Sequence, residues 1–335
     1  MKNRSADLRK AKKNKKDDFY TQLTDIEKEL KYYKSDLEGA VIYCNCDDPK
    51  ISNFFHFFSY NFESLKLKKL ITTCYKNKQE DLFSLEKSNS AVFLEYSGDK
   101  NKNKIPDPEE IDVQELEGDG DFRSQESISF LKESDIVVTN PPFSLFREFV
   151  KQLIEYDKKF IVLGHINAVS YKEIFKLIKN KQIWLGASIH SGDREFGVPK
   201  DYPLNAAGSR IDEHGNKFIS VKGVRWWTNI DYKERHEDLV LFKKFNSSEY
   251  PKYDNYDAIE VSKTKEIPCD YKGVMGVPIT FMDKHNPDQF EILGMAASSY
   301  KKEIQGIPFL GGKDGRPLIK GKNTYARIFI KNKKI

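Results

Sequence analysis

Residues 135–150 read DIVVTNPPFSLFREFV, and this stretch decides the fold class. An unbroken apolar run of strand length is followed by two prolines, which can neither continue a strand nor enter a helix interior. A helical pattern then begins, with apolar residues recurring every three or four positions. Asn140-Pro141-Pro142-Phe143 is therefore a stiff turn between a buried strand and an amphipathic helix.

Similar units flank this one. Strands that alternate with helices predict a mostly parallel, doubly wound α/β sheet that is covered on both faces. The stretch 99–126 is acidic and contains proline, so we expect mostly loop there. The predicted strands are 40–46, 67–75, 90–98, 134–140, 158–166 and 181–186, and the predicted helices are 24–37, 49–62, 144–156 and 171–180.

The pattern changes after about residue 186. The segment 190–199 is polar and contains glycine, which predicts a loop, whereas 218–230 is strand-like and aromatic. From 245 onward, tyrosine, proline and lysine are frequent between turn sequences such as NPDQ and GGKDGRP. This composition predicts a mixed or antiparallel C-terminal module.

The net charge of +5 hides an uneven distribution. Residues 1–16 contain eight Lys/Arg and one Asp, and residues 300–335 contain ten Lys/Arg and two acidic residues. The part between them is acidic. Two basic ends on an acidic body suit a bound polyanion, although a solvated tail and a solvated face would have the same composition.

Composition also excludes some classes. No apolar stretch is long enough to span a bilayer, and no apolar signal segment follows the Lys-rich N-terminus, so we expect a soluble intracellular protein. The four cysteines fit free thiols in a reducing compartment. Cys44 and Cys46 lie on one face of a predicted strand, but no second ligand pair accompanies them. A structural pair is favoured over a zinc site, and we expect no metal.

The turn at Asn140 offers groups that suit a planar ring with an amino substituent. Ligands of open parallel sheets bind at the carboxyl ends of the strands, where Asn140 lies. The Asn140 amide oxygen and the Pro141 carbonyl could each accept one amino hydrogen, and the ring could stack on Phe143. Two fixed acceptors concentrate the lone pair of a conjugated amine for attack on a sulfonium methyl group. The alternative is an ordinary strand-to-helix turn.

Three blocks in this order, DDFYTQLTDIEKEL, VIYCNCDDPKISNFF and VTNPPFSLFREFV, resemble the EcoRI-type adenine-N6 DNA methyltransferases of restriction-modification systems. The similarity extends into GVRWWTNI and GVPITFMDKHNPDQFEILG and covers nearly the whole chain. It implies a Rossmann-like core that uses S-adenosylmethionine, and a C-terminal target-recognition region. It also implies a flipped adenine in double-stranded DNA, a bacterial cytoplasmic location and a partner restriction endonuclease. The oligomeric state stays open, and a monomer is compatible.

The resemblance also implies site residues. The turn, including Pro142, would hold the adenine. The cofactor's methionine end would contact Phe19 to Gln22, and its adenine amine would bond Asp119 or Asp121. Asp47 and Asp48 have an alternative role as the cap of a helix that starts at Pro49. The implied cofactor residues are Phe19, Tyr20, Thr21, Asn45, Asp47, Asp48, Asp119, Asp121 and Phe122, the last by stacking.

DNA contacts are expected from two places. Arg194 could bind a phosphate from a loop that closes over the target base, or 190–199 could be a plain surface loop. Basic residues among the C-terminal turns would form a DNA face, although exposed lysines alone would look similar. These basic residues are Lys313, Arg316, Lys320, Lys322 and Arg327.

Trp226 and Trp227 are predicted to belong to the core, with a place in the wall beside the target base as the alternative.

These assignments divide the chain into a basic arm at 1–17, a catalytic domain at 18–240 and a target-recognition region at 241–335. Rival functions are methyl transfer to cytosine N4, to RNA or to a protein glutamine. A further rival is a DNA-binding protein with a decayed methyltransferase domain. That rival rests on the missing Gly-rich loop after Cys46, a departure from methyltransferases in general that the EcoRI-type family shares.

Overall fold

The computed structural model describes most of the 335-residue chain, namely residues 19–46, 52–73, 91–103, 106, 110–199, 202, 204, 208–298, 300, 304, 306–312 and 314–335. The chain forms two compact units. The first contains residues up to 165 together with 191–230, and the second contains 166–190 and 231–335. The predicted basic arm lies outside the described residues, and the predicted boundary near residue 240 stays a prediction.

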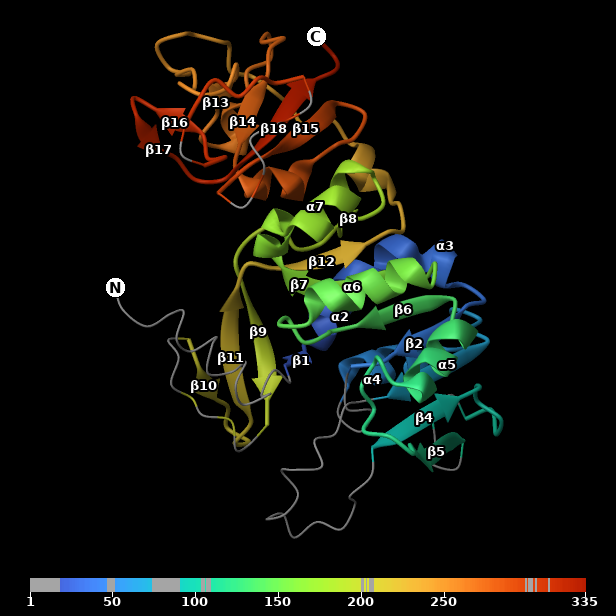
Figure 1. Ribbon diagram of the computed structural model, residues 1–335. Coiled ribbons are helices and arrows are strands. Elements are labelled where there is room, and N and C mark those ends of the chain that lie inside the picture. Colours follow the sequence, from blue (N-terminus) through green and yellow to red (C-terminus); the bar gives the residue numbers. More distant parts are fainter. Residues whose placement is uncertain are drawn as a thin grey trace. The chain divides into compact units, whose positions relative to one another are not determined.

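A large mixed sheet runs through the first unit in the order β5-β4-β3-β2-β6-β7-β12 (Figure 1). The four strands β3, β2, β6 and β7 are mutually parallel, whereas β4, β5 and β12 pair antiparallel. Apolar runs buried on both sides are typical of such central strands. The bounds are β2 (Val41–Cys44), β3 (Lys69–Thr73), β4 (Val92–Tyr96), β5 (Ile111–Glu115), β6 (Ile136–Thr139), β7 (Lys159–His165) and β12 (Val224–Thr228).

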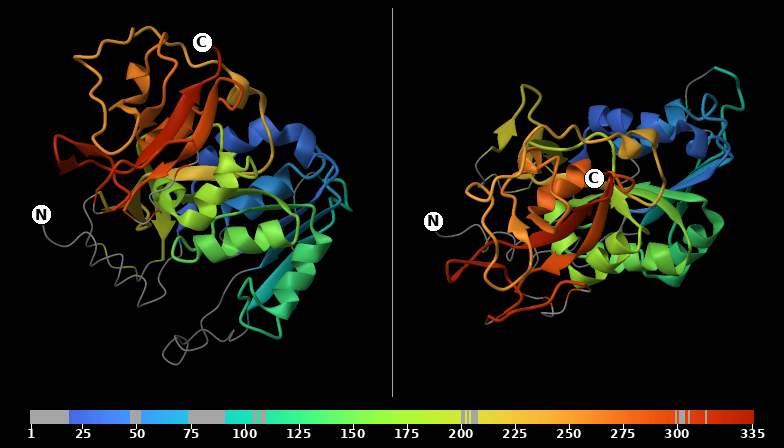
Figure 2. Two further views of the ribbon diagram at one scale, coloured as in Figure 1. Left: turned by 45° about the horizontal axis from the view of Figure 1, so that its top comes forward. Right: turned by 90° about the horizontal axis from the view of Figure 1, so that it is seen from above.

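Helices cover both faces of this sheet (Figure 2). Trp226 and Trp227 are neighbours on β12 and therefore point to opposite faces. The Trp226 ring packs on Phe54, and the Trp227 ring packs on Phe146. Both tryptophans are buried, which confirms the prediction that they belong to the core. The helices are α2 (Leu23–Leu30), η1 (Lys31–Tyr33), α3 (Lys34–Leu37), α4 (Asn53–Tyr60), α5 (Gln125–Glu133) and α6 (Phe146–Glu155).

Two expectations about local structure were wrong. The helix expected from Pro49 begins at Asn53, because the Ser52 hydroxyl accepts hydrogen bonds from the first-turn amides and caps it. The described part of 99–126 is mostly loop, as expected, and also contains β5, a sheet-edge strand whose polar, exposed residues give no apolar signal. The segment 190–199, expected as a loop, contains β9 (Asp193–Val198).

A second sheet in the first unit has the order β1-β9-β11-β10. It joins the short strand β1 (Tyr20–Thr21) to a ribbon formed by β9, β11 (Lys217–Lys222) and β10 (Arg210–Ile211), as Figure 1 shows. In β1, Tyr20 lies opposite Gly197 and Thr21 lies opposite Phe196. This pairing brings the N-terminal segment 19–21 to the ribbon.

The second unit contains a mixed sheet in the order β13-β14-β18-β15, as predicted for the C-terminal module. A short hairpin of β16 and β17 turns at Lys320-Gly321, where both residues have positive φ. The unit's elements are η3 (Ile166–Ser170), α7 (Lys172–Lys179), β8 (Trp184–Leu185), η4 (Lys233–His236), β13 (Ile259–Glu260), η5 (Thr264–Glu266), β14 (Met275–Val277), η6 (Ile279–Lys284), β15 (Phe290–Ala296), β16 (Leu318–Ile319), β17 (Lys322–Asn323) and β18 (Arg327–Asn332).

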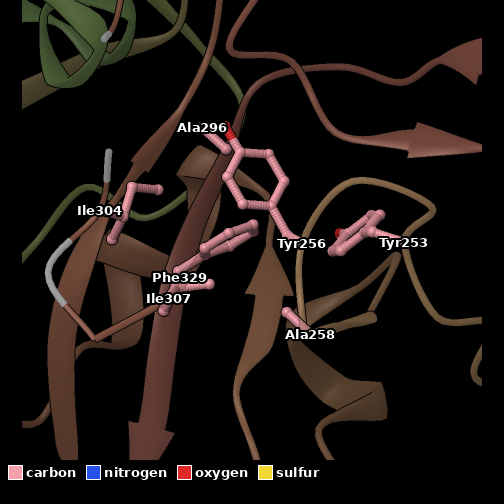
Figure 3. Packing of buried hydrophobic residues seen from close by; sticks show 7 residues of the cluster. All are labelled: Tyr253, Tyr256, Ala258, Ala296, Ile304, Ile307 and Phe329. Carbon is pink, nitrogen blue, oxygen red and sulfur yellow. The ribbon is translucent and has the colours of Figure 1, made fainter. Parts of the chain in front are cut away.

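One face of this sheet carries an apolar cluster (Figure 3). In the cluster, Tyr253 and Tyr256 pack their rings against Phe329 of β18. A Cβ on Gly276 would overlap the Tyr253 side chain, so β14 needs glycine where this tyrosine crosses it. The cluster comprises Tyr253, Tyr256, Ala258, Ala296, Ile304, Ile307 and Phe329.

A histidine in the second unit lies between two carboxylates. His236 Nδ1 is 2.5 Å from Asp288, and His236 Nε2 is 2.8 Å from Asp231, which also pairs with Arg235. Hydrogen bonds to Asp288 and Asp231 raise the pKa of His236 above its ordinary value. The protonated imidazolium therefore stabilises the folded state below the unfolded pKa, and this stabilisation is lost as pH rises through the folded pKa.

Asp288→Asn removes the largest cause of that shift. We expect the pKa of His236, measured by NMR titration of its ring proton, to fall in this variant. The melting temperature of the variant should then lie below that of wild type at acidic pH and converge with it at alkaline pH. Asp257→Asn is a matched control, because Asp257 is an exposed carboxylate of the same unit that pairs with Lys252. An unchanged His236 titration in Asp288→Asn would refute the assignment.

Candidate active site

The turn after β6 lies at a reversal in strand order. The chain continues from β2 to its neighbour β3 on one side, whereas β6 lies on the other side of β2. Crevices at such switch points, beyond the carboxyl ends of the strands, are where ligands of open α/β sheets bind. Asn45 follows β2 and Asn140 follows β6, and the parallel register of Ile42 with Ile136 brings the two strand ends together. Both asparagines are buried.

The Asn140 side-chain amide has a fixed orientation. Its Nδ2 donates a hydrogen bond to the main-chain carbonyl of Phe19 at 2.6 Å. A carbonyl can only accept, so the nitrogen must face Phe19 and Oδ1 must face the other way. In the same turn the Leu145 amide donates to the Pro142 carbonyl, which closes the chain over residues 142–145. The turn thus holds an amide oxygen in a set direction at the carboxyl edge of the sheet.

Aromatic side chains gather beside this amide. The Phe19 ring lies 6.1 Å from Phe143, 5.9 Å from Phe196 and 6.3 Å from Tyr202, measured between ring centroids. The sequence predicted roles for Phe19 and Phe143 separately, and the fold brings them into contact. Phe196 and Tyr202 were not singled out; Phe196 is placed here by the pairing of β1 with β9.

Two buried hydroxyls near this edge fit a polar ligand. Thr21 Oγ1 and Thr72 Oγ1 have no hydrogen-bond partner among the described residues, and the two threonines are 3% and 0% exposed. Buried hydroxyls are normally satisfied, so an unsatisfied one calls for a bound group or water. Thr21 was a predicted cofactor residue, and Thr72 lies near the end of β3. Thr73 differs, since its hydroxyl bonds Tyr43.

The acidic segment before α5 has internal partners. Asp121 forms a two-pronged ion pair with Arg123, and Asp119 Oδ1 accepts a hydrogen bond from the Asp121 amide. Phe122 is buried against Phe149, with ring centroids 5.1 Å apart. The cofactor roles of these three predicted residues stay predictions. Asp47 and Asp48 lie outside the described residues.

Comparison with known proteins identifies the family. A family model described as adenine-specific methyltransferase EcoRI matches residues 7–333. The chain belongs to this family. It is 51% identical to type II methyltransferase M.EcoRI of Escherichia coli over 331 residues, which cover 98% of this chain and 97% of the relative. Type II methyltransferases M.MgeORF184P of Mycoplasma genitalium and M.MpnI of Mycoplasma pneumoniae are each 39% identical, over 97% of this chain and 98% and 97% of the relatives. No solved structure matches.

The EcoRI methyltransferase family was the one predicted from the three sequence blocks, and that prediction is confirmed. The chain is thus an adenine-specific methyltransferase. Within the described residues, no three His, Cys, Asp or Glu side chains cluster in a way that could hold a metal ion. The helices described for this family member include none long and apolar enough to cross a membrane.

The residues predicted to bind DNA differ in their surroundings in this methyltransferase. Arg194 on β9 donates to the carbonyls of Asp193 and Ser191, and its Nε lies 4.0 Å from Asp25. Its predicted contact with a phosphate stays a prediction. The predicted closing loop at this position is wrong, because the segment pairs with β1 and β11 as a strand.

The C-terminal basic residues of the methyltransferase also separate. Lys320 and Lys322 are exposed on the β16–β17 hairpin, whereas Arg316 pairs with Asp314. Arg327, expected on the same face, is buried and paired with Glu260. Lys313 lies outside the described residues. Tyr325 follows the hairpin and is 83% exposed.

Proposed function

We propose that this methyltransferase transfers the methyl group of S-adenosylmethionine to N6 of an adenine in double-stranded DNA, at one short sequence. Such a modification would protect the site from a partner restriction endonuclease. The observation that carries the proposal is the fixed Asn140 amide, whose nitrogen faces Phe19, so that its oxygen is directed away from Phe19 and would accept from an amino group of the substrate. The printed names of the relatives, type II methyltransferases, support the same conclusion.

The proposed chemistry follows from the turn. Asn140 Oδ1 and the Pro141 carbonyl would accept the two N6 hydrogens, and Phe143 would stack on the adenine ring. These contacts draw the nitrogen lone pair out of conjugation and point it along one direction. The N6 group of a paired adenine is engaged and blocked from in-line attack, so the adenine would leave the stack. The amine proton would pass to solvent after transfer, with no strong base required.

The cofactor would supply the methyl group on a sulfonium centre. The residues that would hold it lie at the carboxyl edge of β2 and β3 and on β1. The buried hydroxyls of Thr21 and Thr72 suit a polar ligand, and Asn45 is buried at the end of β2. The other predicted cofactor residues are Phe19, Tyr20, Asp47, Asp48, Asp119, Asp121 and Phe122.

The proposed architecture is a Rossmann-like methyltransferase core followed by a target-recognition region at 241–335. Four parallel strands with helices on both faces support the core. The exposed hairpin lysines and Tyr325 support a DNA-reading role for the C-terminal part. The duplex is the proposed partner, and a monomer suffices for the chemistry.

The proposed function is tested by incubating purified protein with unmethylated bacterial genomic DNA and methyl-labelled S-adenosylmethionine. We expect label in N6-methyladenine at a single short motif after nucleoside analysis and sequencing. Label in N4-methylcytosine, or in RNA or protein offered in parallel but not in DNA, would overturn the proposal.

A DNA-binding protein with a decayed catalytic domain is the rival from another class. Calorimetry with S-adenosylmethionine separates the two functions. The proposed enzyme binds the cofactor with one site per chain. Intact DNA binding without cofactor binding would favour the decayed protein.

The hairpin lysines give a prediction about salt. Lys320→Asn removes a charge but keeps a residue that tolerates positive φ, and Lys322→Gln removes the neighbouring charge. Each should weaken DNA binding at all sequences alike and reduce the slope of log K against log salt by about 1. Lys159→Gln is the control. Lys159 begins β7, at the amino-terminal ends of the parallel strands and not at the carboxyl edge where the proposed site lies, and it pairs with Asp36. Fluorescence anisotropy over a salt series measures the slopes, and unchanged slopes would remove the hairpin from the DNA face.

A further inference from the structure

Two asparagine amides hold the strand β1 in the first unit. Asn140 Nδ2 donates to the Phe19 carbonyl at 2.6 Å, and Asn53 Nδ2 donates to the Thr21 carbonyl at 2.7 Å. Carbonyls two residues apart on an extended chain point to the same side, so both amides bind one edge of β1. One amide belongs to the proposed catalytic turn. The other belongs to Asn53, the first residue of α4, which lies in the block VIYCNCDDPKISNFF but was given no role from the sequence.

We infer that Asn53 is a positioning residue for methyl transfer. It acts through the main chain of β1: its amide fixes Thr21, the Phe19 carbonyl is then held in place, and that carbonyl orients the Asn140 amide. The same bond places the buried Thr21 hydroxyl, which has no partner in the described part of the chain. The inference rests on the proposed function, because it assigns Asn140 Oδ1 to the adenine amine.

A purely structural role for Asn53 in its helix does not explain this geometry. The first-turn amides of Phe54 and Phe55 are already bound by the Ser52 hydroxyl, so α4 does not need Asn53 as a cap. Asparagine is also a poorer helix former than alanine. The sequence therefore places a residue with low helix propensity at this position. Its side-chain Nδ2 donates to the Thr21 carbonyl of β1 and not to a group within α4.

The same helix supplies a matched control. Asn61, at the C-terminal end of α4, donates its Nδ2 to the Phe57 carbonyl at 2.8 Å. Asn53→Ala and Asn61→Ala each delete one amide-to-carbonyl hydrogen bond of α4. Only the first of these bonds reaches β1. A loss of activity specific to Asn53→Ala would therefore report positioning and not helix stability.

The test is single-turnover methyl transfer to a duplex that the wild type methylates, since product release can mask the chemical step. We expect the transfer rate constant of Asn53→Ala to fall about tenfold, because small misplacements of reacting groups cost rate. Asn61→Ala should stay within about twofold of wild type, and Kd for DNA should stay within about twofold in both variants.

Asn53→Asp sharpens the test. A carboxylate at a helix N-terminus favours the helix, yet it cannot donate to Thr21 and would repel that carbonyl. We expect the melting temperature of Asn53→Asp to be at or above that of Asn53→Ala. We expect its transfer rate constant to be at or below that of Asn53→Ala. Transfer rates for both Asn53 variants equal to that of Asn61→Ala would overturn the positioning role alone. A wild type that methylates no adenine in DNA would overturn the proposed function, and the inference with it.

Discussion

Asn140→Ala is expected to lower the rate of methyl transfer by about 10²–10³-fold, the usual effect of removing one preorganised polar contact from a reacting group. The variant loses the oxygen that is proposed to accept from the adenine amine and keeps only the Pro141 carbonyl of the two proposed acceptors. Its Kd for DNA should change by less than about threefold, because contacts outside the turn supply the affinity. Single-turnover label transfer and fluorescence anisotropy measure the two quantities on the same duplex.

Asn229→Ala is the matched control for Asn140→Ala. Asn229 accepts from the Phe160 amide and donates to the Lys158 carbonyl, both at 2.9 Å, at the amino-terminal end of β7. This asparagine also binds the main chain, but it lies at the sheet edge away from the site. We expect the control to lose stability and keep its transfer rate. If Asn140→Ala retained wild-type transfer, or if both variants lost it equally, the turn would not hold the reacting amine.

The turn at Asn140, which is proposed to be catalytic, could be predicted because its signal is local. An apolar strand, two prolines and an amphipathic helix lie within residues 135–150, and proline geometry leaves few alternatives. The central strands were predictable for the same reason, since β2, β6 and β7 each contain a continuous apolar run and β3 is buried along most of its length. Strand β5 was missed because an exposed edge strand such as Ile111–Glu115 has no buried face to impose a pattern.

The partners of the turn could not be predicted in detail, because they are far away in sequence. The bond from Asn140 to Phe19 spans 121 residues and ends on a main-chain carbonyl, which every residue type carries. Resemblance placed Phe19 near the cofactor but gave no reason for it to orient Asn140. The bond from Asn53 to Thr21 is hidden in the same way, since a lone asparagine at a helix start usually indicates only a cap.

In the second unit, a positive charge in the sequence did not indicate a surface residue. Arg327 was grouped with the basic residues of a DNA face, yet its side chain is only 10% exposed. Its guanidinium donates through Nε and Nη2 to the carboxylate of Glu260, which is 7% exposed. Glu260 also accepts from the Tyr253 and Ser262 hydroxyls. Sequence position alone does not separate a surface cation from one that a buried carboxylate requires.

Arg327→Met is expected to destabilise the second unit by about 3–5 kcal/mol, because it leaves Glu260 buried without its counter-charge. The loss should appear as faster hydrogen exchange in β14 and β18, with exchange in β2 and β6 unchanged. Arg327→Lys should recover only part of the stability, since a lysine ammonium cannot reproduce the two-pronged contact.

Arg210→Met provides the exposed counterpart of Arg327→Met. Arg210 contacts Glu195 with the same two-pronged geometry, at 2.8 and 2.6 Å, but its side chain is 51% exposed. Exposed pairs contribute about 0–1 kcal/mol, so this variant should unfold almost as the wild type does. If Arg210→Met and Arg327→Met lowered the free energy of unfolding equally, then pairing geometry, and not the burial of Glu260, would determine the loss of stability. A larger loss in Arg327→Met follows from the dependence of charge pairing on the surrounding dielectric.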